Sequence, residues 1–297
     1  MSWPVFTNGA TLNLILYKHE QGIEDTVRVA NQVGTALAKA GLPARLPADD
    51  RILRLSYPNQ IRYCGLYNYL PGHTIPWEAY TMAHIKLLGK TMSDMHHTLQ
   101  TGDIAAPDIT IVLRAQVQRM NTYFAGLGVQ RAMREKLNIA EFSRVFTSFH
   151  ALLNTLQSAP GQQPLHMDFV RGNILFDGVG QSLQISGILD FEKAAIGHPV
   201  FDVARTLAFL LVDCKYKTED QVRKYFLISG YQKRGAHPLQ LPTISGASVL
   251  EALVNLFLLI DLYKFMLHNP YESLADNEHY VRTRDLLLKR NVIIPVV

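Results

Sequence analysis

Residues 165–178 of the chain read Leu-His-Met-Asp-Phe-Val-Arg-Gly-Asn-Ile-Leu-Phe-Asp-Gly, and residues 187–192 read Gly-Ile-Leu-Asp-Phe-Glu. An apolar run lies on each side of Asp177-Gly178, a dipeptide typical of turns between strands. The stretch therefore predicts an antiparallel hairpin. Since the two outer ends of a hairpin lie next to each other, the polar residues at these ends are expected to meet in space.

Those ends hold Asp168, Asn173 and Asp190. Phosphoryl transfer needs a carboxylate beside the acceptor hydroxyl and hard oxygen ligands for the Mg²⁺ on the nucleotide phosphates. The three side chains supply these groups, with Asp168 as the base and with Asn173 and Asp190 as metal ligands. The alternative is a turn in which Asp and Asn only cap backbone groups. The continuation through Asp190-Phe191-Glu192 and residues 197–204 favours catalysis.

Composition predicts a globular protein, with two unequal lobes as the expectation for its length. Of the 297 residues, 48% are hydrophobic and 18% are charged, which excludes disorder as the main state. The formal charge of +4 is scattered along the chain, so no nucleic-acid groove is expected. Two cysteines make neither a disulfide framework nor a zinc site. The sequence shows no secretory signal and no membrane anchor, so the cytoplasm is the expected compartment.

The two parts of the chain differ in their hydrophobic pattern. Residues 1–70 are expected to form a smaller lobe with one helix, from about residue 25 to 40, and with strands near residues 12–16, 51–55 and 60–70. A strand before the Asn8-Gly9 turn is expected to be very short or missing. Residues 71–297 are expected to be mainly helical, with long helices over residues 77–99 and 131–159.

The motifs in residues 165–204 resemble those of the aminoglycoside phosphotransferase and choline kinase superfamily, and the likeness covers most of the chain after about Leu12. Residues 12–20 and 40–47 are more similar to the homoserine kinase branch than to the antibiotic branch. The resemblance implies an α+β, two-lobed, protein-kinase-like fold with a small antiparallel-sheet N-lobe and a larger helical C-lobe. It also implies ATP, or alternatively GTP, and Mg²⁺ as cofactors.

The resemblance also assigns supporting roles. His166 is implied to support the catalytic loop; an acid or a metal ligand is the alternative, although Mg²⁺ disfavours imidazole relative to oxygen. Asp202 is implied to brace the same loop. Glu192 either reaches a second metal ion or caps the following helix. Arg171 either contacts the transferring phosphate or pairs with a surface carboxylate.

The small lobe matches the family pattern less well. Kinase-like folds pair a strand lysine with a helix glutamate. Lys18 is the candidate lysine, but Tyr17 fits the same position, and a surface role for Lys18 is equally compatible with the sequence. Asn31 lies where the helix glutamate is expected. Backbone groups of the connector are assigned to adenine binding by position, with ordinary aromatic packing in a strand as the alternative; these residues are Tyr67, Asn68 and Tyr69.

The inferred function is transfer of the γ-phosphate of ATP to a hydroxyl group of a small molecule. The expected acceptor is a metabolite such as an amino alcohol or a sugar, or an antibiotic. A nucleotide-binding pseudokinase or scaffold is the alternative, because the small lobe is incomplete. A metal-dependent hydrolase built on His166, Asp168 and Asp190 is disfavoured, because no second histidine or carboxylate lies nearby at ligand spacing. Nucleic acid and membranes are not expected partners, and the sequence does not indicate an oligomeric state.

Overall fold

The computed structural model describes residues 2–49, 51–58, 60–142, 145–232 and 248–296. The chain divides into two units, which are described separately below. Unit 1 comprises Met1–Ala106, Gln162–Ile196 and Arg223–Pro238, and unit 2 comprises Pro107–Gly161, Gly197–Val222 and Leu239–Val297. The lobe boundary after residue 70 stays a prediction.

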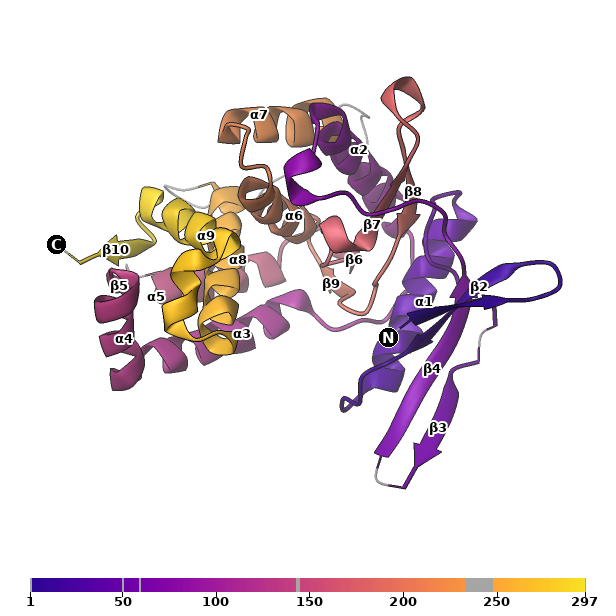
Figure 1. Cartoon of the computed structure of the whole chain (residues 1–297), viewed down its shortest axis with the longest axis horizontal. Coiled ribbons are helices and arrows are strands. Elements are labelled where there is room, and N and C mark those ends of the chain that lie inside the picture. Colours follow the sequence, from indigo (N-terminus) through magenta and orange to yellow (C-terminus); the bar gives the residue numbers. More distant parts are fainter. Residues whose placement is uncertain (1, 50, 59, 143–144, 233–247, 297) are drawn as a thin grey trace. The chain divides into compact units, whose positions relative to one another are not determined.

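Unit 1 begins with an antiparallel sheet of four strands in the order β1-β2-β4-β3 (Figure 1). The strands are β1 (Ser2–Phe6), β2 (Thr11–Leu16), β3 (Leu53–Tyr57) and β4 (Gln60–Asn68). Strand β1 has five residues and pairs with β2 across the Asn8-Gly9 turn, so the first strand of the sheet is present.

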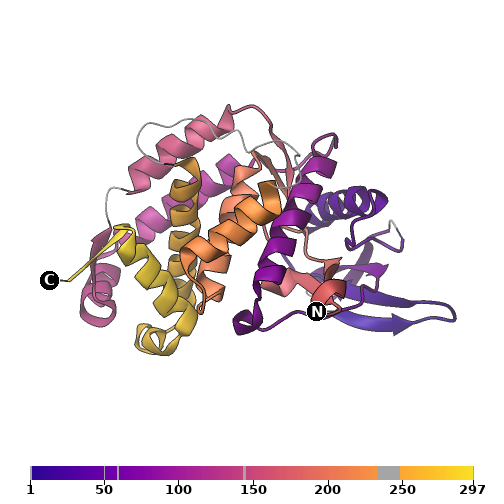
Figure 2. The same ribbon diagram turned by 90° about the horizontal axis from the view of Figure 1, so that it is seen from above.

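Helix α1 (Ile23–Lys39) runs along one face of this sheet in both views (Figures 1 and 2). Its apolar side chains recur at helical spacing, and Val27 packs against Tyr17 and Tyr67 in a buried cluster. At Gly34, helix α1 lies close to the backbone of the segment that follows it. A Cβ atom at this glycine would lie 2.2 Å from the carbonyl oxygen of Arg45.

Adding a methyl group at Gly34 is expected to destabilise unit 1, because a backbone oxygen does not turn aside as a flexible side chain does. Overpacking costs about 1–3 kcal/mol, which exceeds the roughly 1 kcal/mol that alanine gains over glycine in a helix. Gly34→Ala should therefore lower the melting temperature measured by circular dichroism. The exposed change Gln32→Ala in the same helix should leave it nearly unchanged. An equal melting temperature for both variants would show that α1 moves freely away from Arg45.

The rest of unit 1 carries the predicted hairpin. Strand β7 (Ile174–Asp177) pairs antiparallel with β8 (Gln184–Ile188), which confirms the hairpin. Strand β6 (Gln163–Leu165) pairs with β9 (Ala195–Gly197) and leads into the hairpin. The Gln163 side chain donates to the carbonyl oxygen of His96, 2.9 Å away, and so ties β6 to helix α2 (Met82–Leu99).

Helix α2 begins later than the sequence pattern predicts. Residues Trp77–Ala79 form a separate 3-10 turn, and Thr81 then caps α2 by accepting a hydrogen bond from the backbone N–H of His84. The π-helical segment Lys224–Tyr231 packs against α2. Near the end of α2, the Tyr231 hydroxyl lies 2.7 Å from His96 Nδ1.

Unit 2 is mainly helical, and α6 and α8 pack together with most of their apolar side chains buried. Its helices are α3 (Ile109–Phe124), α4 (Leu127–Leu137), α5 (Val145–Gln157), α6 (Val200–Asp213), α7 (Glu219–Arg223), α8 (Val249–His268) and α9 (Glu278–Lys289). A two-stranded sheet joins β5 (Ile139–Phe142) to β10 (Ile293–Pro295). None of the described helices is long and apolar enough to cross a membrane.

The single helix predicted over residues 131–159 is wrong. Helix α4 ends at Asn138, which adopts a left-handed conformation with φ of 55°. Asparagine tolerates this conformation better than most residues, because its short polar side chain bonds locally. The chain then forms β5, and α5 begins at Val145. Residues 143–144 lie outside the described part of the chain.

Candidate active site

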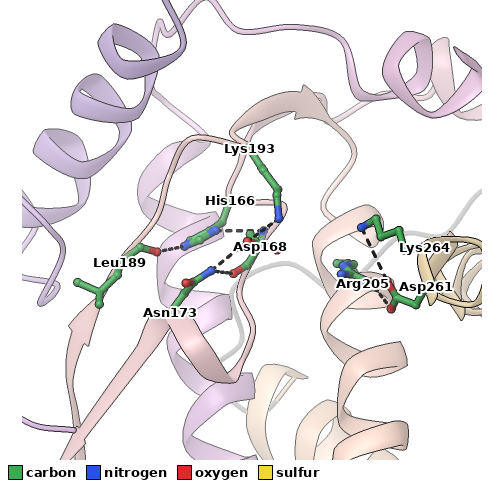
Figure 3. Close-up of polar contacts among 8 residues, drawn as sticks. All are labelled: His166, Asp168, Asn173, Leu189, Lys193, Arg205, Asp261 and Lys264. Atoms are coloured by element: carbon green, nitrogen blue, oxygen red, sulfur yellow. Dashed lines mark hydrogen bonds and ion pairs between the residues drawn. The ribbon is translucent and has the colours of Figure 1, made fainter. Parts of the chain in front are cut away.

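The loop between β6 and β7 in unit 1 holds the predicted base, Asp168, whose side chain is 8% exposed. Asn173 ends the 3-10 turn before β7, and its Nδ2 donates to both the Asp168 carbonyl oxygen, at 2.9 Å, and Asp168 Oδ2, at 3.0 Å (Figure 3). The N–H of Val170 also donates to the Asp168 carbonyl oxygen, at 2.8 Å. The loop therefore closes on itself and fixes the carboxylate.

His166 joins this loop to the segment after β8. Its Nδ1 accepts a hydrogen bond from the Asp168 N–H at 3.2 Å, so its Nε2 carries the proton and donates to the Leu189 carbonyl oxygen at 3.1 Å (Figure 3). The ring is fully buried and lies 4.8 Å from the ring of Phe191. These contacts commit both ring nitrogens to the backbone, and the supporting role of His166 stays a prediction.

Two residues in the predicted catalytic loops have left-handed backbones without being glycine. Met167 and Asp190 both have a φ of 60°. Such conformations cost about 1–3 kcal/mol and persist only where the surrounding contacts enforce them. Here the hydrogen bonds of His166 and of Asn173 hold the two loops, since the Leu189 N–H also donates to the Asn173 carbonyl oxygen at 2.9 Å.

A residue that sequence reasoning missed contacts the predicted base directly. The ammonium group of Lys193 donates to Asp168 Oδ2 at 2.7 Å (Figure 3). Its side chain is 56% exposed, so the contact lies at the surface end of the carboxylate. Its position directly after Asp190-Phe191-Glu192 could have indicated that Lys193 lies in the site. A lysine next to an acidic motif is, however, typical of a solvated surface position.

Asp190 and Glu192 form a pair of interacting carboxyl groups. Burial raises the pKa of Glu192 to about 7, and the hydrogen bond with Asp190 adds to the shift. The same hydrogen bond lowers the pKa of Asp190 below its usual range. The two shifts have opposite directions, so Asp190 ionises at lower pH than Glu192.

Arg45 is the second residue that sequence reasoning missed. It follows α1, and its backbone N–H donates to the Ile188 carbonyl oxygen of β8 at 2.9 Å. Its guanidinium group donates to Glu192 Oε1 at 2.7 Å, with side chains only 6% and 17% exposed, and lies 4.6 Å from the ring centre of Tyr67. Burial alone would lower the pKa of Arg45, but the carboxylate of Glu192 raises it overall.

The oxygen atoms of this cluster suit a magnesium ion. Within the described residues, no group of three or more His, Cys, Asp or Glu side chains forms an all-protein metal site. Mg²⁺ needs no such group, because one or two carboxylates together with phosphate and water oxygens complete its shell. Asp190 and Glu192 are two such carboxylates, and Glu192 Oε2 is buried without a hydrogen-bond donor among the described residues. Asn173 adds an amide oxygen.

In the small sheet, the positions of the expected charged pair hold neutral side chains. The hydroxyl groups of Tyr17 and Tyr67 lie 2.5 Å apart, and the Tyr67 hydroxyl donates to Asn31 Oδ1 at 3.0 Å. Burial raises the pKa of both phenols, so both stay protonated. Lys18 is exposed directly after this buried tyrosine, and its predicted contact with the nucleotide stays a prediction.

The other predicted site residues lie as follows. The Asn68 N–H donates to the Leu46 carbonyl oxygen at 2.9 Å, and Tyr69 is 53% exposed at the end of β4. Arg171 is partly buried in the turn before Asn173. Asp202 is buried in the first turn of α6, in unit 2. Their predicted roles in binding and support stay predictions.

Comparison with known proteins places the chain in a family. Residues 8–225 match the phosphotransferase enzyme family APH. The chain belongs to this family. Membership confirms the predicted enzyme class, a phosphotransferase. No match was found among curated protein sequences.

Solved structures of low sequence identity share the fold of this APH-family chain. A microcompartment-associated aminopropanol kinase is 15% identical with a TM-score of 0.65, over 99% of this chain and 90% of its own. The amicoumacin kinase hAmiN, in complex with AMP-PNP, Ca²⁺ and Ami, is 14% identical with a TM-score of 0.69, over 100% and 87%. Choline kinase from Cryptosporidium parvum Iowa II is 15% identical with a TM-score of 0.52, over 98% and 91%. These likenesses confirm the kinase-like α+β fold.

Proposed function

We propose that this phosphotransferase is a kinase that transfers the γ-phosphate of ATP to a hydroxyl group of a small molecule, with Mg²⁺ as cofactor. The observation that carries the proposal is the carboxylate of Asp168. Asn173 and Lys193 both donate to its Oδ2, and none of the described residues donates to its Oδ1. A carboxylate held by one oxygen presents the other to an acceptor hydroxyl, which is the task of a general base in this reaction.

The cofactors follow from the same cluster. Mg²⁺ would be held by Asp190, Glu192 and Asn173, and it would neutralise charge on the phosphates. The nucleotide would be bound by residues 1–70 and by the backbone of Tyr67, Asn68 and Tyr69, with GTP as the alternative donor. The solved complex of the amicoumacin kinase with AMP-PNP and Ca²⁺ supports a nucleotide and a divalent cation. The cytoplasm is the proposed compartment.

An amino alcohol is the proposed acceptor. Two of the similar structures are named for kinases of aminopropanol and choline. A coupled assay of ADP release with Mg-ATP should respond to aminopropanol, choline or homoserine more than to methylthioribose, simple sugars or kanamycin. A response to kanamycin alone would overturn the proposed acceptor class and leave the kinase assignment in place.

A nucleotide-binding protein without transfer activity is the second candidate. The observation that favours it is the neutral cluster of Tyr17, Tyr67 and Asn31, which stands where kinases use a lysine and a glutamate to position the phosphates. Tight ATP binding in calorimetry, together with no ADP release for any acceptor in the panel, would decide for this candidate.

Asp190→Asn is expected to raise the Mg²⁺ concentration needed for half-maximal activity by at least about tenfold, because it removes the ionised carboxylate of the metal site. EDTA should abolish turnover of the unmodified protein, and added MgCl₂ should restore it. Asp177→Asn is the matched control, since Asp177 is exposed at the end of β7. Activity that survives EDTA would contradict the predicted magnesium requirement.

A further inference from the structure

The proposed reaction needs a cationic side chain beside the transferring phosphate. Charge builds on the phosphoryl oxygens during transfer, and kinases place cationic side chains there to stabilise it. In unit 1, the buried strand-end position holds Tyr17, and the adjacent Lys18 is exposed. Arg45 is already engaged by Glu192 and Tyr67 and is 6% exposed.

Lys193 has the required position. Its ammonium group lies 2.7 Å from Asp168 Oδ2, and its backbone directly follows the carboxyl pair of Asp190 and Glu192. The charge of Lys193 also helps to lower the pKa of Asp190, so its ammonium group acts on both the predicted base and a predicted metal ligand. Because the side chain is 56% exposed and carries its ammonium group on a flexible four-carbon stem, this group can turn toward a ligand without disturbing the core.

The distances of the reaction bring the phosphoryl group within reach of this ammonium group. An acceptor hydroxyl bonded to Asp168 lies about 2.6–3.2 Å from the carboxylate. The phosphorus atom approaches that hydroxyl to about 3–3.5 Å before transfer. The phosphoryl group is thus two short contacts away from the carboxylate that Lys193 bonds, which is within the reach of a flexible lysine side chain.

We propose that Lys193 is a catalytic residue, whose ammonium group bonds Asp168 in the free protein and the transferring phosphoryl group during the reaction. This inference rests on the proposed kinase function. In the step, the bond from phosphorus to the bridging oxygen of ADP breaks and the bond to the acceptor oxygen forms. The hydroxyl proton passes to Asp168, and Lys193 remains protonated throughout.

The alternative role of Lys193 is an ion pair with Asp168 that takes no part in the reaction. The Asp168 carboxylate is largely buried and also accepts from Asn173, but the Lys193 ammonium group is 56% exposed and water can take its place, so Lys193 variants should unfold at nearly the same temperature as the unmodified protein. Loss of activity in a folded Lys193 variant would then report on the reaction and not on stability.

The test compares Lys193→Gln and Lys193→Arg with the control Lys39→Gln, an exposed change at the end of α1. With the best acceptor from the panel, Lys193→Gln should lower kcat by about 100-fold, with a smaller effect on the KM for the acceptor. Lys193→Arg should recover part of this loss because it keeps the charge. An unchanged or increased kcat in Lys193→Gln would overturn the proposal, and an increase would identify the ion pair as a block on the base.

A binding measurement tests the inference without turnover. Calorimetry should show that Lys193→Gln lowers the affinity for Mg-AMP-PNP by about tenfold or more and leaves the affinity for Mg-ADP nearly unchanged, because only the former carries a γ-phosphate. Equal losses for both nucleotides, or no loss, would overturn the role of Lys193 while the kinase function stands. If the unmodified protein binds neither nucleotide, the proposed function itself fails and this inference fails with it.

Discussion

Asp168→Asn is expected to lower kcat by about 10²- to 10⁴-fold, the usual contribution of a positioned general base. The asparagine oxygen can still accept hydrogen bonds from Asn173 and Lys193, which now bond Asp168 Oδ2 at 3.0 and 2.7 Å, so the loop should keep its conformation. The lost property is the capacity to take the hydroxyl proton. ADP release in the coupled assay, with saturating acceptor, measures the effect.

Nucleotide affinity separates this interpretation from a general loss of structure. Asp168→Asn should bind Mg-ATP with an affinity close to that of the unmodified protein. Asp103→Asn, an exposed change outside the loop, should match the unmodified protein in kcat and in binding. Full activity of Asp168→Asn would remove Asp168 from the chemistry.

Arg45→Met is expected to destabilise the protein by about 3–5 kcal/mol, because it leaves a buried carboxyl group without its cation. Arg45 and Glu192 are both largely buried and bond at 2.7 Å, so water does not replace the lost guanidinium group. Glu192 holds a proton easily, with a pKa of about 7, which reduces the charge that remains and favours the lower part of this range. The midpoint of urea unfolding, followed by circular dichroism, measures the change.

Two further variants show whether the cost arises from the pair. Arg54→Met makes the same substitution at an exposed position of β3 and should change the free energy of unfolding by less than about 0.5 kcal/mol. Replacing both partners, in Arg45→Met with Glu192→Met, should recover most of the loss, since an apolar pair often packs as stably as a buried ion pair. A double variant as unstable as the sum of the single variants would show that the two residues act independently.

The meeting of Asp168, Asn173 and Asp190 was predictable because these residues flank one hairpin. Asp168, Asn173 and Asp190 are close in sequence to a turn signal that specifies antiparallel pairing, and the pairing of β7 with β8 then brings the two loops together. Local sequence also specifies the cap that begins the helix after Thr218, whose hydroxyl oxygen accepts from the Gln221 N–H at 3.2 Å.

The features that the sequence did not predict depend on contacts between distant parts of the chain. Arg45 and Glu192 are separated by 147 positions, and no local pattern connects a residue after α1 with one after β8. The break in the helix predicted over residues 131–159 is similar, because β5 forms by pairing with β10 at the far end of the chain. Hydrophobic periodicity describes one segment at a time and does not indicate which distant segment will pack against it.

The cluster of Tyr17, Tyr67 and Asn31 offers two phenols and an amide, and none of these groups is an amine. A nucleotide analogue with an amine-reactive acyl group on its terminal phosphate should therefore leave the cluster unmodified. It should acylate Lys193, so that peptide mapping finds the label beyond β8, whereas a label on Lys18 would support the predicted contact of that lysine with the nucleotide. Covalent inhibitors designed for a strand lysine would need a different anchor in this enzyme.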